Sequence, residues 1–212
     1  MLRVKAYEKF KKCLLTGALK PGQFVTQREL VDLVGVPLGS AREAIRRLEH
    51  ECLLRVFPQR GIQIADVTVA GQRDAFEYRQ ILELHAVQQY ARHGAIKAIE
   101  ALEHATRSVL EQMSTGEVDA ALLGEAVETD WRMHDDIIDS LGNEIVSHNY
   151  RVNAVRIRLM RVTQRQAPAR SVEALTEHLS VLRAAMVRDV EGAVTAMARH
   201  LQVSRQREIE RR

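Results

Sequence analysis

Apolar residues recur at helical spacing along most of this chain. Residues 2 to 16 fit one amphipathic helix, and residues 26 to 48 fit two short helices joined at residues 34 to 36. In the second stretch the apolar positions are spaced for burial, while the arginines are left facing out. This pattern is typical of a helix-turn-helix, in which the second helix enters the major groove of DNA. Thr26 followed by Glu29 predicts a capping box at the start of the first of the two helices.

Strand spacing follows directly after this helical stretch. Residues 53 to 56 and residues 62 to 65 are short β-patterned runs around a turn that begins at Pro58, and they predict a hairpin. A helix-turn-helix followed by a hairpin is a winged helix, in which Arg60 and Gly61 lie at the tip of the wing. A small α+β module that contacts protein has the same pattern, so this alternative stays open.

Beyond residues 66 to 68 the strand pattern stops, and nearly all of the remaining residues show helical spacing. We therefore expect a winged-helix domain at residues 1–66 and a helical domain at residues 67–212. Short breaks between the helices imply antiparallel neighbours. The predicted fold is mostly α, with an antiparallel six-helix bundle formed by residues 68–93, 95–113, 118–141, 144–165, 172–188 and 190–209.

Composition favours a helical protein, and the distribution of charge favours DNA binding by the first domain. Aromatic residues make up only 4% of the 212 residues, so aliphatic side chains must fill the cores. Residues 1–66 carry 12 Lys and Arg against 7 Asp and Glu, which gives +5, and the remainder carries 19 against 21, which gives −2. The basic excess is therefore placed where contacts with phosphates are expected.

The cysteines and the hydropathy pattern indicate a cytoplasmic protein. Cys13 and Cys52 are not in a metal-ligand spacing, and free thiols in a reducing cytosol are the simpler interpretation. The N-terminal residues lack the apolar core of a signal peptide, and no apolar run is long enough to cross a membrane. We therefore expect no membrane partner.

Four ionisable residues interrupt the apolar stripes of the helical domain. Asp130 and His134 occupy the middle of the stripe in the helix at 118–141, where an unsupported carboxylate is costly. His178 and His200 lie on apolar stripes of the last two helices. One Asp and three His from three helices suit a divalent ion such as Zn, Ni, Co or Mn, and the ligand types do not choose among these metals. The alternative that each His is a hydrogen-bonded core residue stays open.

Nearly the whole chain resembles the GntR family of transcription regulators. The second domain is similar to the FCD ligand-binding domain of the FadR subfamily, and six helices suit its smaller, VanR-like branch. In the first domain the resemblance rests on residues 17–22, Arg28-Glu29-Leu30, Gly35-Val36 and residues 42–49. In the second domain it rests on Arg79, Glu83, residues 130–134, Gly142-Asn143, Glu177-His178 and Arg199-His200-Leu201.

This resemblance implies a dimeric regulator, usually a repressor, that binds operator DNA and a small metabolite. The metabolite is commonly a carboxylate, and its oxygen atoms often complete the coordination shell of a metal ion. Family members bind that ion through the residues that match Asp130, His134, His178 and His200. We expect the residues that contact DNA to be Arg28, Ser40, Arg42, Arg46, Arg60 and Gly61.

The start of the recognition helix departs from the family pattern. Relatives usually carry Ser-Arg where this chain has Pro37-Leu38, and Thr-Pro is common where this chain has Gly39-Ser40. Leu38 lacks a guanidinium that could bind guanine through two hydrogen bonds, a contact that is worth about 1–3 kcal/mol of discrimination. We therefore expect an operator that departs from those of the relatives, or weaker binding.

Arg79 and Arg156 are the candidate contacts for a carboxylate of the metabolite. An ion pair with Glu83 at i, i+4 explains Arg79 nearly as well. Two other functions stay open at this point. In a metal-dependent, hydrolase-like enzyme the Asp/His3 site would activate water, and in a dimerisation bundle the metal would be structural. We expect no enzyme, because no separate general base is evident and a basic winged helix is superfluous to catalysis.

Overall fold

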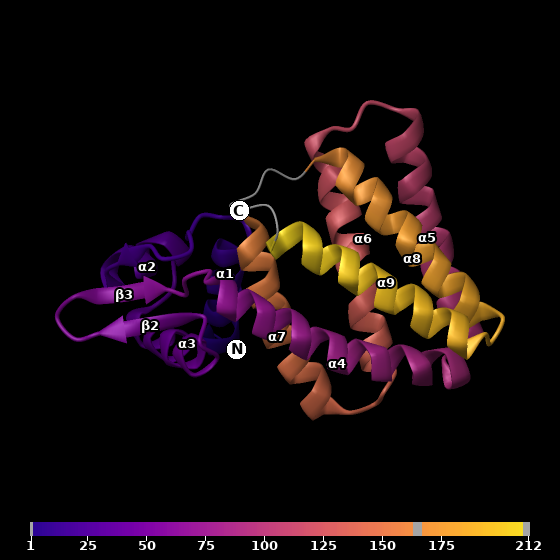
Figure 1. Ribbon diagram of the computed structural model, residues 1–212. Helices are drawn as coiled ribbons and strands as arrows, with labels where there is room; N and C mark the ends of the chain where they lie inside the picture. Colours follow the sequence, from indigo (N-terminus) through magenta and orange to yellow (C-terminus); the bar gives the residue numbers. More distant parts are fainter. Residues whose placement is uncertain (1, 163–166, 210–212) are drawn as a thin grey trace. The chain divides into compact units, whose positions relative to one another are not determined.

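The computed structural model describes residues 2–162 and 167–209 (Figure 1). Contacts divide the chain into two compact units. The first runs from the N-terminus to Ala75 and takes in the stretch that begins at Val152, and the second consists of Phe76–Arg151 and the two C-terminal helices. The fold is mostly α-helical with a small sheet in the N-terminal part, which confirms the predicted fold class.

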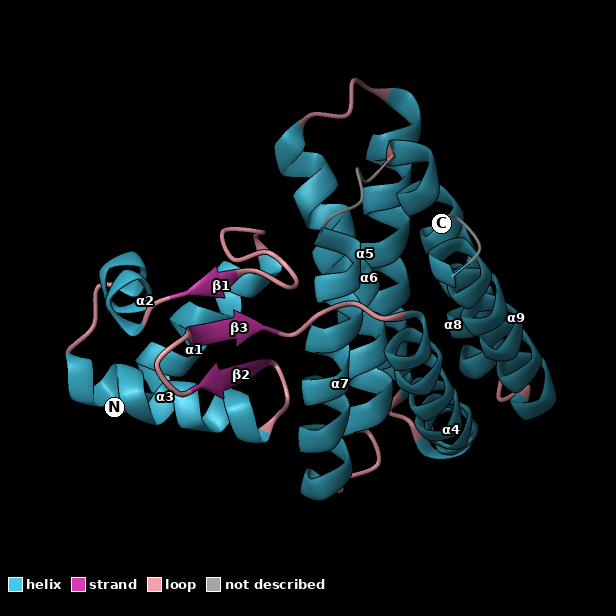
Figure 2. Cartoon of the chain, turned by 60° about the vertical axis from the view of Figure 1, so that its left-hand side comes forward, coloured by secondary structure: helices cyan, strands magenta, loops and turns pink. Residues whose placement is uncertain are grey.

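The first unit contains a winged helix built from short elements. The strands form one antiparallel sheet in the order β1-β3-β2, with Arg55 opposite Gln63 in the hairpin (Figure 2). The sequence predicts the hairpin but not β1, which has two residues and is too short to show strand spacing. In chain order the elements are α1 (Leu2–Leu15), β1 (Phe24–Val25), α2 (Gln27–Val34), α3 (Leu38–His50), β2 (Leu54–Phe57) and β3 (Gly61–Ile64).

Two local features fix the helix-turn-helix. The Thr26 hydroxyl accepts a hydrogen bond from the Glu29 amide at 3.1 Å, and the Glu29 carboxylate accepts one from the Thr26 amide at 2.6 Å. The predicted capping box is therefore present. Gly35 ends α2 with a φ of 58°, a left-handed conformation that glycine adopts without steric cost. The chain can then turn tightly into α3.

The core of the first unit includes residues of a helix from the second half of the chain. Phe10 of α1 and Leu48 of α3 are buried in this core together with Val155 and Leu159 of α7 (Glu144–Val162). Helix α7 therefore begins in the second unit and ends in the first. The sequence pattern places α7 wholly in the helical domain, because an apolar stripe does not show which neighbour covers it.

Six helices follow the wing in the part of the chain that the structure describes. Where the structure describes them, their ends lie within a few residues of the predicted ones; the end predicted at residue 165 lies outside the described residues. Helix α8 starts earlier than predicted because Pro168 occupies its first turn, where proline is tolerated. Helix α8 packs against α5, α6 and α9. None of the described helices is long and apolar enough to cross a membrane. Besides α7, these helices are α4 (Val69–His93), α5 (Ile96–Thr115), α6 (Ala120–Asp139), α8 (Pro168–Met186) and α9 (Val190–Ile209).

Candidate functional site

Three buried histidines meet inside the second unit. His134 comes from α6, His178 from α8 and His200 from α9, and each is at most 3% exposed. Their potential ligand atoms all lie within 4.8 Å of one another. The ring centroids of His178 and His200 are 4.5 Å apart, and those of His134 and His178 are 4.9 Å apart. The structure thus brings together the three histidines that were predicted as metal ligands on three separate helices.

Asp130 lies beside this histidine cluster, one helical turn before His134. Its Oδ1 atom is 3.4 Å from Nε2 of His178, which in turn is 3.3 Å from Nε2 of His200. Tetrahedral ligands at 2.0–2.1 Å from a zinc ion are about 3.4 Å apart. The spacing of Asp130, His178 and His200 therefore fits a divalent metal ion, and so do their oxygen and nitrogen donors.

Burial lowers the pKa of two of the three clustered histidines. Burial is the main cause that lowers the pKa of His178 to about 3, and the neighbouring His200 lowers it further. Burial, followed by the adjacent Arg79 guanidinium, holds the pKa of His134 well below its usual value. A neutral imidazole has a lone pair on one ring nitrogen, and this uncharged form is the one that binds metal ions.

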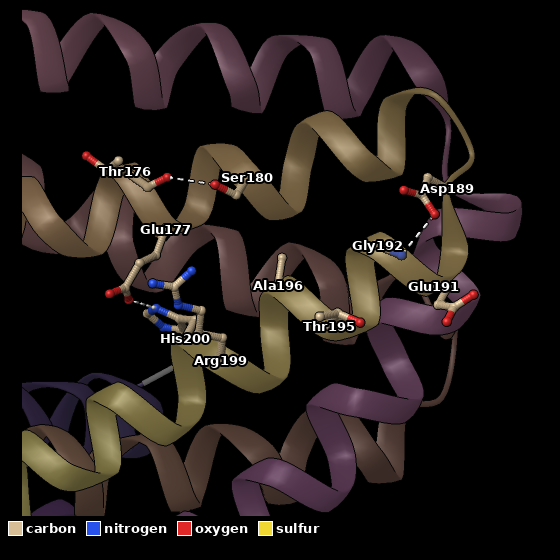
Figure 3. A pocket seen from close by; sticks show the side chains of 10 residues that line it. All are labelled: Thr176, Glu177, Ser180, Asp189, Glu191, Gly192, Thr195, Ala196, Arg199 and His200. Carbon is tan, nitrogen blue, oxygen red and sulfur yellow. Dashed lines mark hydrogen bonds and ion pairs between the residues drawn. The ribbon is translucent and has the colours of Figure 1, made fainter.

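Glu177 orients one of the histidines. Its Oε2 atom accepts a hydrogen bond from Nδ1 of His200 at 2.7 Å, and the other ring nitrogen, Nε2, faces the cluster. A pocket of about 660 Å³ opens between α8 and α9 at this point. Figure 3 shows Glu177, Arg199 and His200 at one end of the pocket and Asp189 with Glu191 at the other. His200 is therefore both a member of the cluster and part of the pocket wall.

A buried ion pair borders the cluster on the side of His134. Arg79 is 1% exposed and Glu83 is fully buried, and Nε of Arg79 donates to Oε1 of Glu83 at 2.6 Å. The hydroxyl of Tyr150 donates to the same oxygen at 2.7 Å. Burial lowers the pKa of the Arg79 guanidinium, but the negative charge of Glu83 raises it by more. The pKa therefore stays above its usual value. A permanent cation thus lies next to the predicted metal ligands.

Arg79 also contacts the histidine cluster directly. Its Nη2 atom donates to Nε2 of His134 at 2.7 Å. The other ring nitrogen of His134, Nδ1, is 2.7 Å from Oε2 of Glu83, although these two atoms are not aligned for a hydrogen bond. Nη1 of Arg79 is buried and has no hydrogen-bond partner among the described residues. Arg79 therefore has one donor group available for a further acceptor.

Arg156, the second predicted contact for the metabolite, is placed elsewhere. It belongs to the first unit, where its Nη2 atom donates to the backbone carbonyl of Glu51 at 2.7 Å. Glu51 follows the last residue of α3, so this bond satisfies a carbonyl at the end of that helix. The structure thus gives Arg156 a partner in the winged-helix unit and does not group it with the histidines.

The predicted DNA contacts lie on exposed parts of α2 and α3. The side chains of Arg28 and Arg42 are exposed, and Ser40 is half-buried. The Arg46 side chain is 74% exposed and forms an ion pair with Glu43 at 2.9 Å. Because an exposed ion pair contributes little free energy, Arg46 can exchange Glu43 for a DNA phosphate. Helix α3 begins at Leu38, which is 47% exposed and stands where a base contact is expected.

The wing carries the last two predicted contacts. Arg60 is exposed in the turn between β2 and β3. Gly61 has a φ of 102°, and a Cβ atom added to it would lie 2.8 Å from the carbonyl oxygen of Val25 in β1. The sheet therefore requires glycine at this position, which explains Gly61 without any contact to DNA.

One polar cluster of the first unit was not foreseen from the sequence. Glu51 is buried and accepts from the Tyr7 hydroxyl at 2.6 Å and from Nε of Arg47 at 2.9 Å. The Arg47 guanidinium also lies over the Tyr7 ring, 3.8 Å from its centroid. Arg47 thus ties α3 to α1. The i, i+4 spacing of Arg47 and Glu51 was a signal for part of this cluster.

Two family patterns match the chain. The pattern of the gntR family of bacterial regulatory proteins matches residues 2–64, and that of the FCD domain matches residues 74–203. The FCD match alone covers more than half of the 212 residues.

Similar proteins and structures extend these matches over nearly the whole chain. YdhC, an uncharacterised HTH-type transcriptional regulator of Bacillus subtilis (strain 168), is 22% identical over 194 residues, which are 92% of this chain and 85% of YdhC. McbR/YncC of E. coli aligns with a TM-score of 0.81 and 20% identity, over 96% of this chain and 94% of that chain. The metal-free FCD domain of TM0439 aligns with a TM-score of 0.57 and 21% identity, over 69% of this chain and 96% of that chain. The structural likenesses show a shared fold.

Proposed function

The chain belongs to the GntR family of bacterial regulatory proteins, as a transcription regulator with an FCD domain, and from this premise we propose what controls it. It acts as a homodimeric repressor in the cytoplasm. A small carboxylate, bound at a divalent metal ion in the helical unit, changes its affinity for operator DNA.

The spacing of the predicted metal ligands carries this proposal. Nε2 of His178 lies 3.4 Å from Oδ1 of Asp130 and 3.3 Å from Nε2 of His200, and burial lowers the pKa of His178. His134 is the fourth ligand, from the same helix as Asp130. When bound, the ion supplies positive charge and coordination positions for carboxylate oxygens; Zn, Ni, Co and Mn all suit these donors.

Arg79 supplies the second recognition element for the carboxylate. It is a buried cation beside the histidine cluster, and its Nη1 donor has no partner among the described residues. A guanidinium binds a carboxylate through two parallel hydrogen bonds, which selects this chemical class over neutral ligands. Arg156 is held by Glu51 and is not part of the proposed site.

The first unit binds the operator. In a homodimer two α3 helices lie in successive major grooves, with Arg28, Arg42 and Arg46 on phosphates or base edges and Arg60 in the wing along a groove. The exposed Leu38 at the start of α3 supports an operator that departs from those of relatives.

Two helices are placed to carry the regulatory change between the units. The sequence suggests a linker at residues 66 to 68, but contacts assign these residues to the first unit. The chain instead passes between the units within α4, after Ala75, and within α7, after Arg151. We therefore propose that a rearrangement around Arg79 in α4 and Tyr150 in α7 reaches the DNA-binding unit through these two helices.

Replacing Arg42 by alanine tests the DNA-binding surface. Loss of one phosphate contact is expected to weaken binding and to reduce the slope of log affinity against log salt by about 1. The measurement is fluorescence anisotropy with DNA that the wild-type protein selects from a random pool. Arg92, exposed on α4 in the second unit, provides the control variant Arg92→Ala. Unchanged affinity and salt slope for Arg42→Ala would remove Arg42 from the interface.

A further inference from the structure

Arg79 occupies the only lone pair that His134 can offer to a metal ion. An imidazole nitrogen has one lone pair, which either accepts a hydrogen bond or binds an ion. Nε2 of His134 accepts from Nη2 of Arg79 at 2.7 Å, so the proton of the neutral ring is on Nδ1, which faces Oε2 of Glu83 at 2.7 Å. While this hydrogen bond persists, His134 cannot act as a metal ligand.

The other three predicted ligands already have the spacing of ligands around one ion. Nε2 of His178 lies 3.3 Å from Nε2 of His200 and 3.4 Å from Oδ1 of Asp130, the separations expected of ligands around one ion. The cluster therefore has three ligands at suitable spacing and a fourth that is held by a cation. Full coordination requires that Arg79 release His134.

The released guanidinium has a defined place and two donors to offer. Its Nε atom remains anchored to Oε1 of Glu83 at 2.6 Å, and Tyr150 holds that carboxylate in turn. Nη1 has no hydrogen-bond partner among the described residues, and Nη2 loses its partner when His134 turns to the ion. Two adjacent donors without acceptors form the fork that a carboxylate fits.

We propose that Arg79 is an exchange residue: the metal ion displaces it from His134, and the freed guanidinium then binds the carboxylate. This inference rests on the proposed function. It adds that metal and carboxylate bind cooperatively, because a carboxylate neutralises the guanidinium that otherwise repels the ion and returns to His134. By linkage, each ligand raises the affinity for the other by the same factor, typically about 5- to 150-fold.

Zinc affinity, measured by competition with a chromophoric chelator, tests this exchange. In the wild-type protein acetate is expected to raise the affinity for Zn²⁺ about 5-fold or more, whereas chloride at equal ionic strength has no effect. The double variant Arg79→Met with Glu83→Gln removes the buried ion pair as a whole. It is expected to bind Zn²⁺ at least about 5-fold more tightly than wild type without acetate, and to lose the acetate effect.

The matched control is the variant Arg107→Met with Glu103→Gln, which removes an ion pair of the same i, i+4 spacing whose arginine side chain is 47% exposed. It is expected to behave as wild type. Equal zinc affinity in wild type and the Arg79 double variant, or no acetate effect in wild type, would overturn the exchange while leaving the metal site intact. If wild type binds no Zn²⁺ at all, the proposed function fails with it. The acetate measurement on wild type needs no variant to fold.

Discussion

Replacing Glu83 by alanine is expected to lower the free energy of unfolding of the helical unit by about 3–5 kcal/mol. Glu83 is fully buried and its Oε1 atom accepts hydrogen bonds from both Arg79 and Tyr150. Without it the Arg79 guanidinium stays charged in the interior and loses the carboxylate to which its Nε atom donates. An uncompensated buried charge is among the most destabilising changes that a single substitution can produce.

Urea denaturation followed by circular dichroism measures this loss. The control is Glu103→Ala, because Glu103 pairs with Arg107 and Arg183, whose side chains are 47% and 61% exposed. Pairs of this kind contribute about 1 kcal/mol or less. A Glu83→Ala variant that unfolds at the same urea concentration as the control would show that the buried pair does not support the fold.

Replacing His178 by alanine is expected to lower metal affinity by more than 100-fold. This estimate is a lower bound, since loss of a residue that merely orients a ligand costs about 10- to 100-fold. His178 is the central ligand, because its Nε2 atom lies within 3.4 Å of both Asp130 and His200. The first unit contains none of these residues, so affinity for DNA in the absence of metal and carboxylate should not change.

Elemental analysis of protein purified without chelators, followed by the zinc competition assay, measures this effect. His148→Ala is the control, since His148 is an exposed residue on α7. If the His178 variant retains metal in the same ratio as the control, the histidine cluster is not the metal site.

Local patterns were sufficient to predict most of the fold. The capping box at Thr26, the turn at Gly35 and the wing each depend on neighbours in sequence. The histidine cluster could also be found, because polar residues on otherwise apolar stripes point inward wherever the helices pack. Strand β1 was not predicted, because two residues are too few to show the alternation of apolar and polar residues that is typical of a strand.

Contacts between distant parts of the chain could not be predicted. Arg79 reaches His134 across 55 positions, and Arg156 reaches Glu51 across 105. Neither partner follows from spacing, because the pairing depends on how the helices are packed. The same limit applied to the assignment of α7 to two units.

Operator affinity in the presence and absence of metal tests the central claim most directly. DNA selected from a random pool is titrated with zinc-loaded and with metal-stripped protein, each with and without a series of small carboxylates. We expect at least one carboxylate to change the dissociation constant of the zinc-loaded protein about 5- to 150-fold and to leave that of the stripped protein unchanged. An equal response of both forms would contradict control through the metal site, and absence of DNA binding in both would contradict the regulator itself.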